Sequence, residues 1–291
     1  MLLTEIFYHS DNFCKELDQH LKNNALNNTK PGPKQLLTKS EIMTIVIYFH
    51  HSKIRTFKDY YQLFIKQTLM TAFGKTPSYN RFIELISACS MPLYMFLSLC
   101  RLGAITGTSF IDSTKLAVCL NLRISSNRVF KGVAARGKTS TGWFYGFKLH
   151  IIINEYGEII AFDVTPGNCD DRNEKVMNNL TKNLFGRLFG DRGYISGKLF
   201  KRLYEKGIQL FTKSKKNMPN RLIGFEEKLL LNKRGLIESV NAILKTQHYI
   251  EHTRHRSKTN FFVNLIAGLI AYSFRDKKPT IIDYPVAAIA S

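Results

Sequence analysis

The spacing of apolar residues changes near residue 100, and this change decides which folds are open to the chain. Before it, apolar residues recur at the three- and four-residue intervals of a helix, as over residues 42–49. After it, TSFIDST, WFYGFKLHIIIN and EIIAFDVTPGN are rich in β-branched and aromatic residues and are separated by Gly, Asn and Pro, which is typical of strands. Strand-like and helix-like segments then alternate to about residue 246.

This order of segments predicts an α/β fold, a mixed sheet flanked by helices, preceded by an all-helical N-terminal region. Residues 1–100 form the helical region, which is compatible with a helix-turn-helix-like DNA reader and equally with a bundle that only packs. Residues 101–255 hold the sheet. Residues 256–291 are expected to form a C-terminal helix and tail that pack on the sheet domain, since the apolar run 261–274 is too short to span a bilayer.

The charge of the chain is strongly one-sided. Lys and Arg number 42 against 22 Asp and Glu, a formal net charge of +20 in 291 residues. Such an excess indicates a polyanionic partner, with nucleic acid as the leading candidate. Seven basic residues and no acidic one lie between Asp112 and Glu155, and a generic solvated face is the alternative interpretation. We expect the basic segments 115–148 and 198–234 to neutralise phosphates.

The cysteines and the N-terminus indicate where such a protein works. Five scattered cysteines without a CxxC pair predict buried thiols in a reducing compartment, and neither a disulfide framework nor a zinc site. The first residues lack the basic and apolar regions of a signal peptide. We therefore expect a soluble cytoplasmic protein with no membrane partner.

Three carboxylates occupy marked positions in the predicted elements. Asp112 lies in the first predicted strand, Asp191 ends a later one within FGDRGY, and Glu238 lies on the final predicted helix. Both Asp residues have apolar or Gly neighbours, where a free charge is costly. Carboxylates that meet at the rim of a sheet repel one another unless cations lie between them. Oxygen ligands suit Mg²⁺ or Mn²⁺, and two such ions can clamp both reacting oxygens of a phosphodiester.

The helix around Glu238 has one polar stripe. Arg234, Glu238, Asn241 and Lys245 fall within a narrow sector, while the apolar residues gather on the opposite side. This stripe is a candidate surface for DNA phosphates. An ordinary solvated face with an Arg234–Glu238 pair explains the same pattern.

Other residues have two interpretations each. Lys148 and His150 share a strand face that can approach DNA, or that is simply exposed. Asp171 is either an additional carboxylate beside the metals or a helix N-cap. Trp143 can stack on an unpaired base or pack on the sheet. The stretch that begins at His248 is rich in His and Arg and can contact phosphates.

Several of these segments, in chain order, resemble the catalytic domain of bacterial DDE insertion-sequence transposases. They are FIDST, GWFYGFKLHIIIN, TPGNCDDRN, FGDRGY and the helix from Arg234 to Lys245. The similarity is greatest to the insertion sequence 982 family, for which other stretches of this chain also look typical: SEIMTI, SYNRF, VFKG, RGKTS and EHTRHRS. The resemblance extends over nearly the whole chain.

The resemblance implies an RNase H-like fold in which Asp112, Asp191 and Glu238 match the family's catalytic and metal-binding triad. An Arg four residues before the Glu and a Lys seven after it also match a wider signature of Tyr, Arg, Glu and Lys. Leu231 stands where the Tyr of that signature would be. Arg234 and Lys245 are then expected to contact DNA phosphates.

The resemblance further implies a transposase that cleaves phosphodiester bonds at the ends of its insertion sequence and joins the 3′-hydroxyl ends to target DNA. Two Mg²⁺ or Mn²⁺ ions would serve as cofactors, and the partners would be the terminal inverted repeats and the target DNA. A homodimer is expected because two element ends need two active sites, and the location would be the bacterial nucleoid. A metal-dependent nuclease of the same fold and a non-catalytic DNA-binding protein derived from such an enzyme are the alternatives.

Overall fold

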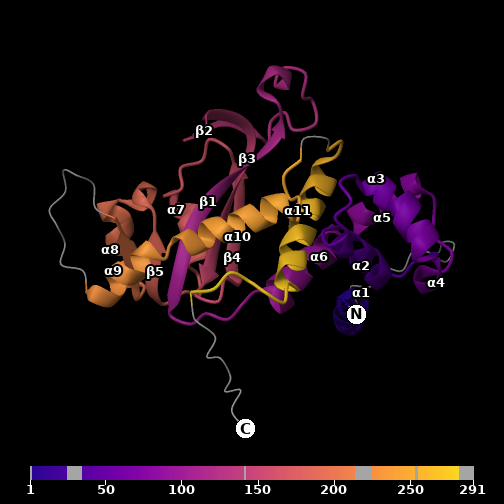
Figure 1. Ribbon diagram of the computed structural model, residues 1–291, viewed down its shortest axis with the longest axis horizontal. Coiled ribbons are helices and arrows are strands. Elements are labelled where there is room, and N and C mark those ends of the chain that lie inside the picture. The colour runs from indigo at the N-terminus through magenta and orange to yellow at the C-terminus, as the bar shows by residue number, and fades with distance from the viewer. Residues whose placement is uncertain (1, 25–34, 141, 214–223, 253–254, 282–291) are drawn as a thin grey trace, which may run out of the picture. The chain divides into compact units, whose positions relative to one another are not determined.

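The change in apolar spacing near residue 100 coincides with the boundary between two units in the computed structural model (Figure 1). The structure describes residues 2–24, 35–140, 142–213, 224–252 and 255–281. The helical unit comprises the described residues of Met1–Arg101, Leu244–Ile250 and His255–Arg275. The sheet unit comprises those of Leu102–Ile243, Glu251–Arg254 and Asp276–Ser291. Parts of the predicted regions lie outside the described residues: 1 and 25–34 of the helical region, 141 and 214–223 of the basic segments, 253–254 of EHTRHRS, and 282–291 of the tail.

The N-terminal part of the helical unit confirms the all-helical prediction. Two of its segments, η1 and η2, are π-helical. In chain order the elements are α1 (Leu2–Asn23), α2 (Lys39–Phe49), α3 (Phe57–Asp59), η1 (Tyr60–Thr68), α4 (Met70–Phe73), α5 (Tyr79–Ala88), α6 (Ser90–Phe96) and η2 (Leu97–Arg101).

Local sequence signals begin these helices. Thr38 caps α2 in a capping box, in which its hydroxyl accepts from the N–H of Glu41 and the Glu41 carboxylate accepts from the N–H of Thr38. Ser78 caps α5 with its side-chain oxygen alone, which accepts from the N–H of Arg81. Stacked rings then join η1 to α5, with the centroids of Tyr61 and Phe82 4.4 Å apart.

The C-terminal helix α11 (Lys258–Ser273) packs within the helical unit, against α2, α5 and α6. The sequence led us to expect it on the sheet domain instead. The helix is apolar on nearly all sides and buries residues from Phe261 to Tyr272, so it needs neighbours all round, which a bundle supplies. A Cβ at Gly268 would lie 2.4 Å from Ile250, so glycine permits this close packing. No described helix alone is long and apolar enough to cross a membrane. Helix α5 and the α6–η2 segment have the necessary length and composition only together, and the pair is bent by 55°.

His248 belongs to the buried interior of the helical unit, although the sequence made phosphate contact plausible for the stretch that begins with it. Its side chain is 2% exposed, and its ring lies 5.3 Å from that of His51 in an edge-on arrangement. The backbone carbonyl of His248 also bonds to the ring of His50. Burial, with smaller contributions from the neighbouring His50 and His51, lowers the pKa of His248 to about 3. A neutral buried imidazole does not serve as a phosphate ligand.

The described part of the sheet unit folds into a six-stranded mixed sheet. Strands β1, β5 and β6 run parallel, and β3 pairs antiparallel with β1 on one side and with both β2 and β4 on the other. The strands are β1 (Thr108–Cys119), β2 (Ala135–Thr139), β3 (Gly142–Asn154), β4 (Ile159–Pro166), β5 (Gly186–Gly190) and β6 (Ile208–Thr212). The predicted mixed sheet is confirmed, with β2 as an additional short strand.

A tight hairpin turn joins β3 and β4. The side-chain oxygen of Asn154 accepts from the N–H groups of Tyr156 and Glu158. Gly157 adopts φ +71°, a left-handed conformation that glycine reaches without strain. This turn sets the register that pairs Ile151 of β3 with Phe162 of β4.

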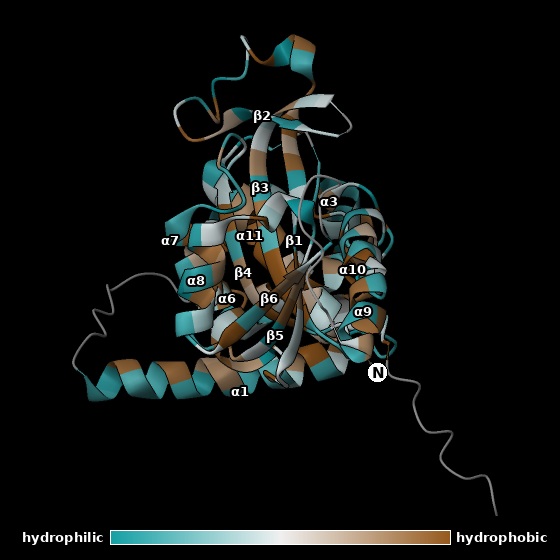
Figure 2. Ribbon diagram, turned by 90° about the vertical axis from the view of Figure 1, so that its left-hand side faces the viewer, coloured by the Kyte–Doolittle hydropathy of each residue, from teal (hydrophilic) through white to brown (hydrophobic). Residues whose placement is uncertain are grey.

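Helices cover both faces of the sheet. Figure 2 shows α7 (Glu174–Leu180) and α8 (Gly197–Glu205) on one side, and α9 (Phe225–Asn232) and α10 (Gly235–Thr246) on the other. The first face packs Ile111, Ile152 and Leu188 against Met177 of α7 and Leu203 of α8. The other face of β1 therefore carries the alternate residues, including Asp112. Two short 3₁₀ segments, η3 (Asn121–Arg123) and η4 (Arg192–Tyr194), follow β1 and β5.

Candidate active site

The register between β1 and β5 brings Asp112 and Asp191 to neighbouring positions. The strands are parallel, and Phe110 pairs with Phe189. Each Asp follows its Phe by two residues, so both carboxylates leave the same face of adjacent chains that run about 4.8 Å apart. The two Phe rings stack with centroids 5.4 Å apart on that face. The repeated Phe-X-Asp spacing in FID and FGD is a signal in the sequence from which this pairing could have been predicted.

Asp191 is held at the turn that follows β5. Its backbone stays extended (φ −79°, ψ 179°), and its Oδ1 accepts from the N–H of Gly193 over 2.8 Å, which caps η4. A Cβ at Gly193 would lie 2.8 Å from this same oxygen. Glycine therefore gives the carboxylate room, and the FGDRGY motif positions an acidic side chain at the rim of the sheet.

Helix α10 joins the site through Asn241. Its Nδ2 donates to Oδ2 of Asp112 over 3.1 Å, and the side chain is only 8% exposed. Glu238 lies one turn earlier on the same helix, and the guanidinium of Arg234 donates to its Oε1 over 2.7 Å. The apolar side of this turn, with Ile237 and Val240 fully buried, holds the helix in place. Asn241, one residue of the predicted polar stripe, therefore points toward the carboxylates.

The three carboxylates influence one another electrostatically. Burial, with a smaller contribution from the negative charges of Asp191 and Glu238, raises the pKa of Asp112 to about 6. The N–H of Ser113 and the charge of Arg234 act in the opposite direction. Asp112, Asp191 and Glu238 thus come from three distant segments of the sequence and share one neighbourhood.

This donor set matches the chemistry of Mg²⁺ or Mn²⁺, because it consists of carboxylate oxygens that repel one another. The side chains are nevertheless engaged with protein donors: Asn241 on Asp112, Gly193 on Asp191 and Arg234 on Glu238. Among the described residues, no three His, Cys, Asp or Glu side chains are close enough together to hold an ion as they stand. The residues fit the ions in type and in neighbourhood, and binding would require the three carboxylates to move closer together.

The other predicted phosphate-binding residues have different surroundings. Lys148 donates to Oδ1 of Asp171 over 3.0 Å and to the Cys169 carbonyl over 2.8 Å, and its side chain is 13% exposed. Its strand face is not an exposed one, since His150 is fully buried. Lys245 lies on the part of α10 that belongs to the helical unit.

Asp171 belongs to a polar cluster that the sequence did not reveal. It is not the helix N-cap, because Asn173 caps α7 by accepting from the N–H groups of the first turn. Its Oδ1 lies 3.8 Å from Nδ1 of His150, whose Nε2 bonds to the Thr165 hydroxyl over 2.8 Å. Burial lowers the pKa of His150, while the charge of Asp171 raises it. The pair of Asp171 and Lys148 is thus partly buried in the sheet unit, next to the fully buried His150.

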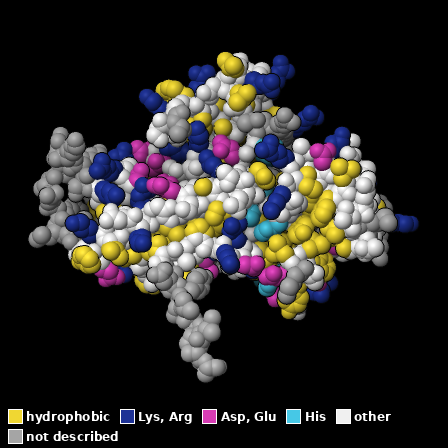
Figure 3. Space-filling model, viewed as in Figure 1, with side chains coloured by type: hydrophobic (Ala, Val, Ile, Leu, Met, Phe, Trp, Pro, Cys, Tyr) yellow, Lys and Arg dark blue, Asp and Glu magenta, His cyan; other side chains and the backbone are white. Residues whose placement is uncertain are grey.

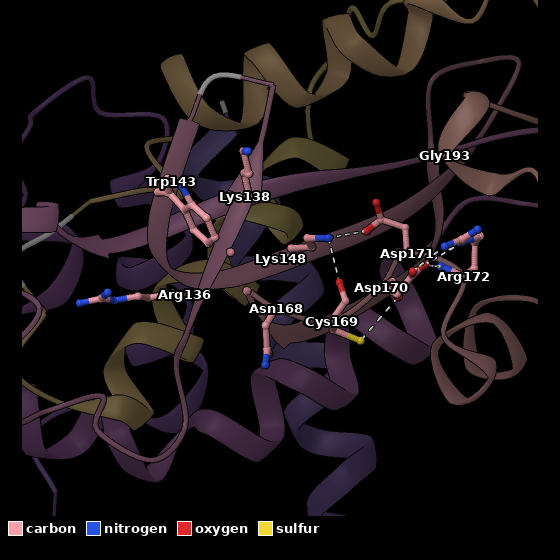
Figure 4. A pocket seen from close by; sticks show the side chains of 12 residues that line it. Arg136, Lys138, Trp143, Lys148, Asn168, Cys169, Asp170, Asp171, Arg172 and Gly193 are labelled. Carbon is pink, nitrogen blue, oxygen red and sulfur yellow. Dashed lines mark hydrogen bonds and ion pairs between the residues drawn. The ribbon is translucent and has the colours of Figure 1, made fainter. Parts of the chain in front are cut away.

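A pocket of about 420 Å³ opens between the β2–β3 hairpin and the loop that follows β4 (Figure 4). The hairpin supplies Trp143, Lys138 and Arg136 at one end, and Asp171 and Arg172 lie toward the other. Gly193, whose N–H holds Asp191, also lines this pocket. The pocket therefore adjoins the carboxylate site.

The comparisons with known proteins agree with this geometry. A family model described as "Transposase DDE domain" matches residues 102–258, which is more than half of the chain. The chain therefore belongs to the family of DDE transposase domains. A comparison with curated proteins returns no match.

Solved structures resemble the chain at low sequence identity. The piggyBac transposase in a synaptic complex with hairpin DNA has a TM-score of 0.53 at 10% identity, covering 94% of this chain and 72% of the other. A simian T-cell lymphotropic virus intasome has a TM-score of 0.28 at 11% identity, covering 77% of this chain and 73% of the other. The Mos1 transposase paired-end complex has a TM-score of 0.28 at 11% identity, covering 90% of this chain and 84% of the other. The first score shows a shared fold, and the other two are too low to do so. The mixed sheet with flanking helices is thus RNase H-like, as predicted.

Proposed function

We propose that this protein is a transposase that cuts DNA at the ends of its own mobile element and joins the 3′-hydroxyl ends to target DNA. The observation that carries the proposal is that strand register places Asp112 beside Asp191, and that Asn241, on the same helix as Glu238, bonds to Asp112. Membership in the DDE transposase-domain family supports it. Three mutually repelling carboxylates destabilise the fold, and a need for cations explains why they are together.

Asp112, Asp191 and Glu238 would hold two Mg²⁺ or Mn²⁺ ions, as the family generally does. When bound, such ions activate the attacking oxygen and stabilise the leaving oxygen of a phosphodiester. Gly193 and Asn241 orient the carboxylates of Asp191 and Asp112 through the hydrogen bonds described above.

Arg234 acts as an internal counter-ion for Glu238 before the site is loaded. Their ion pair is partly solvent-exposed, with side chains 23% and 59% accessible, so it is worth less than about 1 kcal/mol and yields readily. Once released, Arg234 is free to contact the neighbouring phosphates, and Lys245 supplies charge farther along the same helix.

The DNA substrate would be the terminal inverted repeats of an insertion sequence together with target DNA. The net charge of +20 supports binding that weakens steeply with salt, and the helical region 1–100 would hold the repeats. The stretches SEIMTI, SYNRF and RGKTS favour the insertion sequence 982 family and a bacterial host. The piggyBac structure is a synaptic complex with DNA, which supports a homodimer that pairs two ends here.

A strand-transfer assay tests the proposal. The full chain is mixed with a pre-cut end bearing a free 3′-hydroxyl, target plasmid, and Mg²⁺ or Mn²⁺, and joined products are expected. Hydrolysis without joining would indicate a nuclease of the same fold, and binding without cutting would indicate a DNA-binding protein derived from a transposase.

Matched variants separate the site from the scaffold. Asp191→Asn should abolish joining, because it removes a charged ligand while preserving an acceptor for the Gly193 N–H. Asp163→Asn is the control, since that carboxylate accepts from Val164 and Asn179 in the same unit and should leave joining unchanged. Joining by Asp191→Asn at the wild-type rate would refute the assignment of Asp191.

A further inference from the structure

Trp143, the only Trp in the chain, is exposed on the sheet unit. Its side chain is 62% accessible, although large aromatic side chains usually bury most of their surface. Its backbone is fixed, because the carbonyl of Trp143 accepts from Nδ2 of Asn121 and the residue pairs with Lys138 across β2 and β3. The backbone that carries the indole is therefore fixed at the pocket, and Nζ of Lys138 lies 5.7 Å from the ring centroid.

The wall of the pocket beside Trp143 is rigid as well. A Cβ at Gly137 would lie 2.1 Å from the Gly167 carbonyl oxygen, and a Cβ at Gly167 would lie 2.7 Å from that of Ala135. The strand and the loop after β4 are thus in direct backbone contact. The pocket volume of about 420 Å³ lies within the range of roughly 300–1,000 Å³ that holds single small ligands. A pocket of this size suits one nucleotide and not a duplex.

The charges lining the pocket leave a positive excess at the indole. Asp171 is paired with Lys148 over 3.0 Å, and Asp170 with Arg172 over 2.7 Å, so the acidic end is neutralised within the protein. Arg136 and Lys138 are exposed and form no ion pair with any carboxylate in the described part of the chain. An exposed aromatic face beside two available cations is the combination that binds single-stranded nucleic acid.

The basic surface continues from the pocket onto the segment between β1 and β2. This segment projects at the top of Figure 3, where Lys and Arg side chains lie together with exposed hydrophobic ones. Arg123, Arg128 and Lys131 are exposed there, as is Leu122 at 95%. A DNA strand entering the pocket would therefore have phosphate contacts on its way in.

We propose that the pocket binds one unpaired deoxynucleotide of the strand next to the bond that is cut. Its base stacks on Trp143, and its phosphate lies against Arg136 and Lys138. The location rests on the proposed function, because Gly193 belongs both to the pocket lining and to the hydrogen bond that holds Asp191. The site would favour DNA whose end is already unpaired, or would help to unpair it.

Two fluorescent DNA probes test the pocket with the full-length protein. Both have the same duplex sequence, one blunt and one with a short unpaired tail that carries 2-aminopurine, and binding is measured in EDTA so that no cutting occurs. Wild-type protein should bind the tailed probe more tightly and quench its 2-aminopurine. Trp143→Ala should weaken tailed-probe binding roughly 5- to 150-fold and leave blunt-probe binding unchanged, since stacking is lost only where a base is unpaired.

Further variants keep the test specific. Trp143→Phe should restore part of the preference, because it keeps an aromatic face. Tyr204→Ala is the matched control, since Tyr204 is 63% exposed on α8 in the same unit and does not line the pocket. Arg136→Ala combined with Lys138→Ala should weaken binding of the tailed probe and reduce the salt dependence of that binding, with little change for the blunt probe.

The outcomes separate this site from the proposed reaction. Equal affinity of wild type and Trp143→Ala for the tailed probe, with both folded by circular dichroism, overturns the pocket even if strand transfer is observed. A Trp143-dependent preference for the tail supports the pocket even if no cutting occurs in Mg²⁺ or Mn²⁺, and the proposed reaction alone then fails.

Discussion

Replacing Asp112 with Asn should stabilise the metal-free protein at neutral pH, although it removes a proposed catalytic residue. Burial, together with the charges of Asp191 and Glu238, raises the pKa of Asp112 from 3.8 to about 6. At pH 7 Asp112 is therefore ionised in the folded chain, although its surroundings favour the neutral carboxyl group. The shift is roughly two pKa units at about 1.36 kcal/mol each, so the penalty is about 3 kcal/mol.

The pH dependence has a definite sign. Because the pKa is higher in the folded state, the native chain binds more protons than the unfolded chain between about pH 4 and pH 6. Stability therefore falls as the pH rises through this window. Asp112→Asn has no such titration, and its amide oxygen can still accept from Asn241. Its advantage in the free energy of unfolding should be close to zero at pH 4 and about 3 kcal/mol at pH 7.

Urea unfolding in EDTA at several pH values measures this difference. Trp143, the only Trp in the chain, lies in the sheet unit, so its fluorescence reports the unfolding of that unit. Asp163→Asn should show no comparable gain, because the native carboxylate already accepts from Val164 and Asn179. A gain that is absent at pH 7, or equal at pH 4 and pH 7, would refute the electrostatic account. Added Mn²⁺ should stabilise the wild type and not Asp112→Asn.

Three other predictions concern the packing, the helical unit and DNA. Gly137→Ala should lower the stability measured by thermal unfolding by about 1–3 kcal/mol, because the added Cβ would collide with Gly167. Gly197→Ala is the control and should not destabilise the protein, since a Cβ there meets nothing within 4 Å. Because the buried His248 has a pKa of about 3, it binds a proton only after unfolding, and the wild type should lose about 2 kcal/mol of stability as the pH falls from 7 to 5. His248→Phe should remove this loss when unfolding is measured at both pH values. DNA affinity should fall steeply and log-linearly with salt in a titration; a flat response would contradict a phosphate-dominated interface.

Most elements could be predicted because their signals are local. Apolar spacing, the caps at Thr38 and Ser78, and the turn at Gly157 act within a few residues, and the structure follows them. β2 was missed because ARGKT has no alternating apolar pattern, and it is a strand only through its pairing with β3. The burial of α11 followed from its composition, but its choice of neighbours did not.

The candidate site also combines features that the sequence determines with features that only the tertiary structure decides. The amino-acid order alone determined the carboxylates of Asp112, Asp191 and Glu238, the positive net charge and the order of strands and helices, because composition and hydrophobic period are properties of the chain itself. Strand register and helix docking then decided that the two Asp residues lie side by side and that Asn241 bonds to one of them. These arrangements depend on contacts between segments far apart in the chain, which no local pattern specifies.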